Sequence, residues 1–222
     1  MIAKLKSIWL KVEAWFILIL AKIKWKSVNE LNTEEHVAIR ALLLPNYYVI
    51  LTHRNNELST FFTQFANLFL TGKWGYWTHA LMNMEDEVKT DGDFRLIEAV
   101  GTGTKFTPFD GVFNCHGVCI LKPTHLPVEA WTAILDKAKT ELGKPYDTLF
   151  DIANDNALSC VELVRAALMA EPNYATDFAA FEAIIKKYHN NLSPDMYYDN
   201  PDFEVVYERR HAGKSIIKAL KG

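Results

Sequence analysis

Three things are scarce or missing in this sequence, and each absence removes a class of protein. The 222 residues include only three cysteines, an odd number and too few for a disulfide scaffold. The apolar run at 14–21 has eight residues, whereas a helix that spans a membrane needs about 20. No glycine-rich phosphate loop or His-Glu-x-x-His motif is present, and Gly101 and Gly103 lack the rest of a dinucleotide fingerprint. P-loop, Rossmann-type and zincin-type functions are therefore excluded.

The overall composition is that of a folded protein. Half of the residues are hydrophobic, 13% are aromatic and 23% are charged, so enough apolar surface is available to offset the entropy of the chain. No repeat, linker or Pro/Gly/Ser-rich boundary interrupts the central part. We therefore expect one domain over 29–210, with appendages at 1–28 and 211–222.

The net charge of −3 conceals a marked asymmetry along the chain. Residues 1–26 contain six lysines and one glutamate, and residues 209–222 contain five basic residues and no acid. Residues 27–208 therefore hold a net charge of −13. An acidic body of this kind is a poor partner for nucleic acid, so we expect no nucleic-acid function.

The N-terminal segment has the pattern of a basic, apolar helix. At 100° per residue, lysines fall on one stripe beside an apolar face. Such a helix can lie on an anionic membrane surface, or dock on a partner subunit or on the acidic body itself. A secretory signal is a further alternative, but lysines stand where its cleavage site belongs. A cytoplasmic or membrane-peripheral location is therefore favoured over secretion. The lysines of the stripe are Lys4, Lys11, Lys22 and Lys26.

The body of the chain predicts helices around a sheet made mainly of consecutive strands, which is an α+β pattern. A turn at Asp91–Asp93 is expected to join the second and third strands, and the next strand to extend the same antiparallel meander. The C-terminal 211–222 is expected to be a solvated tail. Predicted helices cover 33–44, 57–70, 127–142 and 160–169, and predicted strands cover 47–52, 76–84, 94–100, 117–121 and 203–207.

Two cysteines are close enough in sequence to raise the question of a metal site. Cys115 and Cys119 flank His116, but the spacing is not that of a zinc knuckle and no second pair of ligands follows. The surrounding apolar run favours a buried strand in which cysteine packs as a small hydrophobic residue. We therefore expect no metal.

Cys160 stands in a different context. It follows Asn156-Ala157-Leu158-Ser159 and begins a strongly helical stretch, so its sulfur is expected at a helix N-terminus. The free N–H groups and the helix dipole favour a thiolate there. A thiolate with a nearby base can act as a nucleophile, and the same N–H groups can hold an oxyanion.

Four segments together resemble a known family. They are Trp77-Thr78-His79-Ala80-Leu81, then Leu96-Ile97-Glu98-Ala99, then Tyr146-Asp147-x-x-Phe150, and finally Cys160-Val161-Glu162-Leu163-Val164. Their order and spacing are similar to those of the circularly permuted NlpC-type papain-like proteins, the YiiX/YaeF-like group. The order His before Cys marks the permutation, and the resemblance covers residues 43–170.

The resemblance implies a permuted papain-like fold and assigns roles to particular residues. Cys160 is the implied nucleophile, His79 the general base, and Glu98 the residue that orients the imidazole. Read without the resemblance, Glu98 is equally a partly exposed strand residue paired with a lysine or arginine. Tyr146 and Trp77 are candidate substrate contacts, and no cofactor is implied.

The expected function is that of a cysteine hydrolase, an amidase or peptidase. The resemblance implies amide substrates, either cell-wall (peptidoglycan) peptides or small peptide or acyl amides. One alternative is a lipid-directed acyltransferase or thioesterase at a membrane surface, which the N-terminal segment would hold there. Another is a non-catalytic structural or binding protein that keeps the fold.

Overall fold

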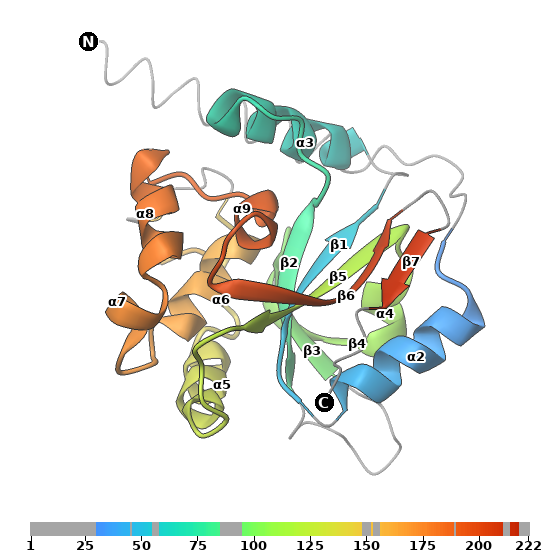
Figure 1. Cartoon of the computed structure of the whole chain (residues 1–222), viewed down its shortest axis with the longest axis horizontal. Helices are drawn as coiled ribbons and strands as arrows, with labels where there is room; N and C mark the ends of the chain where they lie inside the picture. The colour runs from blue at the N-terminus through green and yellow to red at the C-terminus, as the bar shows by residue number, and fades with distance from the viewer. Residues whose placement is uncertain are drawn as a thin grey trace.

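A computed structural model gives the arrangement of most of the body of the chain (Figure 1). The expected N-terminal helix over 1–28 and the expected turn at Asp91–Asp93 lie outside the residues that it describes. The described residues are 30–44, 46–54, 58–84, 95–147, 152, 156–188, 190–210 and 214–217.

Within this described part, seven strands form one antiparallel sheet. Their order across the sheet is β4-β3-β2-β1-β5-β6-β7. All neighbours run antiparallel while helices cover both faces, which confirms the α+β class. The strands are β1 (Val49–His53), β2 (His79–Met84), β3 (Arg95–Val100), β4 (Gly103–Pro108), β5 (Gly117–Pro123), β6 (Phe203–Arg210) and β7 (Lys214–Ile217).

The sheet differs from the predicted meander in one strand. We expected residues 117–121 to follow β3, but that place belongs to β4, which the sequence did not predict. β5 instead crosses to the other side of the sheet and pairs with β1, Leu51 opposite Cys119. The prediction failed because β4 carries a glycine at its start and a proline at its end, which weaken the strand signal but are tolerated on an edge strand.

Helices pack on the two faces of the sheet (Figure 1). One face, which carries Val49 and Leu51, packs against α5, α6, α8 and α9. The other, which carries Ile50, packs against α2 and α4. This alternation along β1 is the period of two expected of a strand buried on both sides. The helices are α2 (Thr33–Leu43), α3 (Leu58–Thr71), α4 (Phe109–Phe113), α5 (Ala130–Thr140), α6 (Cys160–Leu168), α7 (Tyr174–Asp177), α8 (Ala179–Lys187) and α9 (Pro194–Tyr198).

The predicted helices form where local signals are strongest. α2 starts after Asn32, whose side chain accepts from the N–H of Glu35, while the Glu35 carboxylate accepts from the N–H of Asn32. This reciprocal pair is a capping box. α5 begins at Ala130, three residues after the predicted start, because residues 127–130 form a turn closed by the N–H of Ala130 on the carbonyl of Pro127. No helix within the described ranges is both long enough and apolar enough to cross a membrane.

The C-terminal part of the chain is more structured than predicted. Residues 214–217, expected within a solvated tail, form β7 and pair with β6, Lys214 opposite Arg210. The short helices α7, α8 and α9 were also not predicted. These helices have four to nine residues, too few for a clear helical periodicity in the sequence. Their stability depends on packing against the rest of the domain.

Candidate active site

Cys160 is the first residue of α6, as predicted. Ser159 precedes the helix in an extended conformation, and its N–H donates to the Glu162 carboxylate at 2.7 Å. This contact fixes the first turn of the helix and thereby the place where the sulfur emerges. Cys160 is buried and is 5% exposed.

The sulfur of Cys160 lies against the sheet where the pairing between β2 and β3 ends. Pairing between β2 and β3 extends only from Met84 to Met82 on β2, although β3 continues to Val100 paired with β4. The N–H of Ala80, beyond the end of this pairing, donates to the sulfur of Cys160. The N–H of Val161, in the first turn of α6, donates to it as well. Two backbone donors from different elements therefore converge on the thiolate.

His79 begins β2 and lies between Cys160 and Glu98. Its Nε2 lies 2.8 Å from Oε2 of Glu98, and since a carboxylate only accepts, the imidazole donates here. This leaves Nδ1 as the nitrogen for Cys160, with which the ring also forms a side-chain hydrogen bond. The three residues predicted to act together thus form one hydrogen-bonded chain.

A residue that the sequence did not single out completes this chain. Thr107 on β4 donates its hydroxyl to Oε1 of Glu98 at 2.6 Å. It is buried and sits opposite Leu96 on β3, two pairs along the ladder from Glu98, so both side chains lie on the same face of the sheet. Each oxygen of Glu98 therefore has a donor. Since β4 was not predicted, no sequence signal could have placed Thr107 here.

The pKa values of the three residues show that the site favours an ion pair. Burial alone raises the pKa of Cys160, but the His79 imidazolium and the two backbone N–H groups outweigh it and lower the pKa below its ordinary value. Burial alone lowers the pKa of His79, but Cys160 and Glu98 outweigh it and raise the pKa to about 10. Burial likewise opposes ionisation of Glu98, yet the donors His79 and Thr107 lower its pKa to about 2. These shifts all favour the charged forms, a thiolate, an imidazolium and a carboxylate.

The two residues predicted as substrate contacts lie in different environments. Tyr146 is half-buried and its hydroxyl hydrogen-bonds the sulfur of Cys160. Burial, and then the negative charges of Cys160 and Glu162, raise the pKa of Tyr146, so the phenol stays protonated and can donate. Trp77 is fully buried and packs edge-on against Tyr76 at 4.8 Å. It is a core residue with no exposed surface for a ligand.

The other cysteines lie away from this chemistry. Cys115 and Cys119 are fully buried free thiols, and Cys119 lies within β5, in agreement with the predicted buried strand. Burial raises the pKa of Cys115 to about 12 and that of Cys119 well above its ordinary value. Their thiols stay protonated and are poor nucleophiles.

Comparisons with known proteins support the fold. The sequence matches no protein-family model and no curated protein. The structure is similar to the crystal structure of metalloprotein YiiX from Escherichia coli O157:H7, with a TM-score of 0.52 and 19% sequence identity. The similarity covers 74% of this chain and 97% of that one. The chain therefore has a YiiX-like fold, which confirms that part of the resemblance seen in the sequence.

Proposed function

We propose that this chain is a cysteine hydrolase with a circularly permuted, NlpC-type papain-like fold, and that it cleaves amide bonds. The hydrogen-bonded chain from Cys160 through His79 to Glu98 carries the proposal. It combines a nucleophile, a base and an orienting group in the order that thiol hydrolysis requires. The YiiX-like fold supports it, because it agrees with the resemblance that assigned these roles to the three residues.

The reaction begins at the sulfur. The Cys160 thiolate attacks the carbonyl carbon of an amide, a C–S bond forms, and the carbonyl oxygen becomes an oxyanion. N–H groups at the start of α6 lie at the positive end of the helix dipole and stabilise it. The intermediate collapses as the C–N bond breaks, and Nδ1 of His79 gives its proton to the leaving amine.

Water completes the cycle. His79, now neutral, takes a proton from a water molecule that attacks the thioester carbonyl. The C–S bond breaks, a carboxylic acid is released, and the proton on His79 restores the imidazolium beside the thiolate. Glu98 keeps its negative charge throughout and holds Nε2 of His79 in place.

The name of the E. coli protein raises the question of a metal, and the side chains here do not fit one. Among the described residues, no group of three or more His, Cys, Asp or Glu side chains converges as a set of metal ligands. The imidazole of His79 stands between Cys160 and Glu98 and uses Nε2 to donate to the carboxylate. A single ion could not be bound by all three without breaking that hydrogen bond.

The substrates that we propose are peptides of the bacterial cell wall or small peptide or acyl amides. The test uses the full chain, a panel of such amides, and a matched pair of variants. Cys160→Ala should abolish hydrolysis and labelling by an iodoacetamide probe. Cys119→Ala removes a buried thiol outside the site and should leave both in place. Hydrolysis that persists in Cys160→Ala would contradict the proposal.

A second candidate is acyl transfer or ester and thioester cleavage on lipids. The observation that favours it is the sequence of residues 1–26, with six lysines around an apolar run, which suits an anionic membrane surface. Sedimentation with phosphatidylserine vesicles compares the full chain with a chain that begins at Asn29. Binding that is lost on truncation supports this candidate, and equal sedimentation of the two removes its basis. A Cys160 that forms no acyl adduct by intact mass with any of these substrates would favour a non-catalytic protein.

A further inference from the structure

The short helix α9 makes contact with both halves of the candidate site. It follows Ser193 and spans only five residues, and its sequence gave no sign of a role. Cys160 and His79 lie on different elements, α6 and β2, and pairing between β2 and β3 has ended where they meet. α6 packs directly on β2, and the contacts of α9 to α6 and to the segment that leads into β2 add a second connection between them.

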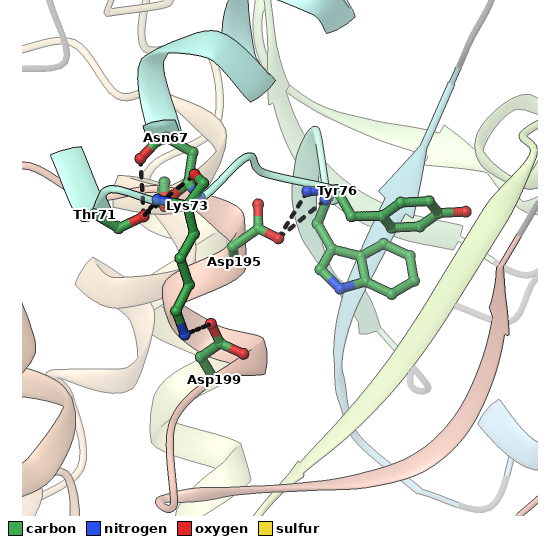
Figure 2. Close-up of polar contacts among 8 residues, drawn as sticks. Asn67, Thr71, Lys73, Tyr76, Asp195 and Asp199 are labelled. Atoms are coloured by element: carbon green, nitrogen blue, oxygen red, sulfur yellow. Dashed lines mark hydrogen bonds and ion pairs between the residues drawn. The ribbon is translucent and has the colours of Figure 1, made fainter. Parts of the chain in front are cut away.

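The first contact is to the segment that leads into His79. Oδ1 of Asp195 accepts from the N–H of Tyr76 at 2.9 Å and from the N–H of Trp77 at 3.4 Å (Figure 2). These residues precede His79 by three and two positions. The other oxygen of Asp195 lies 2.8 Å from where a Cβ on Gly75 would stand. Glycine at 75 therefore allows the carboxylate to reach the backbone.

Asp195 is held there at an energetic cost. Burial raises its pKa to about 6, even though the two backbone N–H groups act to lower it. Oδ2 is buried and has no hydrogen-bond partner among the described residues. A buried carboxylate with one oxygen unsatisfied is unfavourable for stability. A carboxylate kept under these conditions is more readily explained by the backbone that it positions than by the stability of the fold.

The second contact is to the segment that carries Cys160. The hydroxyl of Tyr197 donates to the carbonyl of Val161 at 2.7 Å, and Tyr197 is fully buried. Val161 is the neighbour of Cys160, and its N–H donates to the sulfur. Through the hydroxyl of Tyr197, α9 therefore forms a hydrogen bond to the first turn of α6, next to the nucleophile.

The helix is itself fixed to a third element. Ser193, the residue before α9, donates its hydroxyl to Oδ1 of Asn67 on α3 at 2.6 Å. The side-chain amide of Asn67 in turn donates to the carbonyl of Lys73 at 3.1 Å, in the segment that leads to β2 (Figure 2). α9 is thus anchored at its start, while Asp195 and Tyr197 contact the two arms of the site, the segment before His79 and the first turn of α6.

We propose that α9 sets the distance between Cys160 and His79, with Asp195 and Tyr197 as positioning residues. The inference rests on the proposed function, since it concerns the same pair. A catalytic pair must be held to within about 0.5 Å of its working geometry. The side chains of α9 connect the two arms directly, so a change in either one moves Cys160 relative to His79.

The last residue of the helix and the residue that follows it supply matched controls. Tyr198 adjoins Tyr197, but its hydroxyl donates to Glu208 at 3.3 Å. Asp199 lies one turn from Asp195 and forms an exposed ion pair with Lys73 at 3.7 Å. The test variants are therefore Tyr197→Phe and Asp195→Ala, and the controls are Tyr198→Phe and Asp199→Ala. Asp195→Asn keeps an oxygen that can accept from the backbone and serves as the rescue variant.

The measurement is the rate constant for alkylation of Cys160 by iodoacetamide across pH 4–9, with thermal unfolding of each variant alongside. The loss of one hydrogen bond in Tyr197→Phe, or of two in Asp195→Ala, should lower the rate at pH 6 about 2- to 10-fold and shift the low-pH limb of the rate profile to higher pH. Asp195→Asn should recover most of the rate, and the controls should follow the wild type. A residue that serves stability alone would lower the unfolding temperature and leave the pH profile in place.

The outcomes separate this inference from the proposed function. Wild-type alkylation that persists at low pH, with test variants that follow the same profile, overturns the positioning role and leaves the hydrolase proposal intact. Wild-type alkylation with the profile of an ordinary thiol overturns both. If Asp195→Ala does not fold, Tyr197→Phe decides alone, because it removes one hydroxyl and keeps the ring in the core.

Discussion

Replacing Glu98 with glutamine removes one negative charge from the site and keeps the size of the side chain. The amide oxygen can still accept from His79, and the amide nitrogen can donate to the Thr107 hydroxyl, which turns from donor to acceptor, so the geometry can persist. The change therefore tests the charge itself. Because the pKa of Glu98 is about 2, the wild-type carboxylate is ionised at every pH of the assay.

The size of the effect follows from the contact between Glu98 and His79. The two atoms lie 2.8 Å apart, and the Glu98 side chain is 9% exposed, so water screens the interaction little. A hydrogen bond to a charged group contributes about 1.5–3 kcal/mol. At about 1.36 kcal/mol per pH unit, this corresponds to roughly one to two pH units.

The direction of the change follows from the loss of the negative charge. Without the carboxylate, the imidazolium is less stable, so the pKa of His79 falls from about 10. A fall of this size still leaves His79 protonated below roughly pH 8, so the positive charge beside the Cys160 sulfur persists there. We expect the pKa of His79 to fall by about one to two pH units, and the low-pH limb of the rate profile for iodoacetamide alkylation not to move to higher pH.

The assay is an NMR titration of the His79 imidazole in the full chain, with alkylation across pH 4–9, read by intact mass, alongside. Asp136→Asn is the control, since it removes an exposed carboxylate on α5 whose partner is Lys139 at 3.8 Å. The control should match the wild type. A His79 pKa that stays in place in Glu98→Gln would refute the reasoning, because Glu98 would then have no electrostatic effect on the imidazolium.

Three further predictions follow from the same structure. Native protein treated with iodoacetamide at pH 6 should be labelled at Cys160 alone, since burial keeps the other two thiols protonated, and peptide mapping that finds either of them modified first would contradict this. Tyr146→Phe removes a hydroxyl that hydrogen-bonds the sulfur and should slow alkylation about 2- to 10-fold at that pH; an unchanged rate would show that the hydroxyl does not stabilise the thiolate. Gly103→Ala should lower the free energy of unfolding by at least about 1–2 kcal/mol, because Gly103 has φ of 104° and an added Cβ would stand 2.7 Å from the carbonyl of Lys144. Urea titration measures it, and a midpoint equal to the wild type would mean that the loop adjusts freely.

Much of the fold could be predicted because its signals are local. α6 begins at Cys160, and α2 begins after a capping residue, because helix starts are specified by a few adjacent side chains. β1 and β5 are runs of apolar residues buried on both faces. β4 could not be predicted in the same way. Among the described strands it lies at the edge of the sheet and pairs only with β3, so it tolerates both glycine and proline.

The residues of the candidate site likewise divide into those that the sequence indicated and those that only the packing revealed. Cys160, His79 and Glu98 could be proposed because their segments occur in the order and spacing of a known family. The resemblance could not reveal that Trp77 is fully buried, because the neighbours that cover it come from distant parts of the chain. Thr107 was missed with the strand that carries it. Asp195 was missed because its role depends on which backbone groups lie beside α9.

The sequence by itself determined the elements, the residue types and the chemistry that they allow: a cysteine at a helix N-terminus, a histidine at the start of a strand and an acidic body between basic ends. The tertiary structure decided which of these groups meet. Pairing between β2 and β3 stops short, so that Ala80 can donate to the sulfur, and α9 contacts both arms of the site. The physical reason is the distance along the chain over which each kind of interaction acts. Capping and periodicity act over a few residues, whereas hydrogen bonds and pKa values at a buried site depend on groups that only the complete packing brings within about 3 Å.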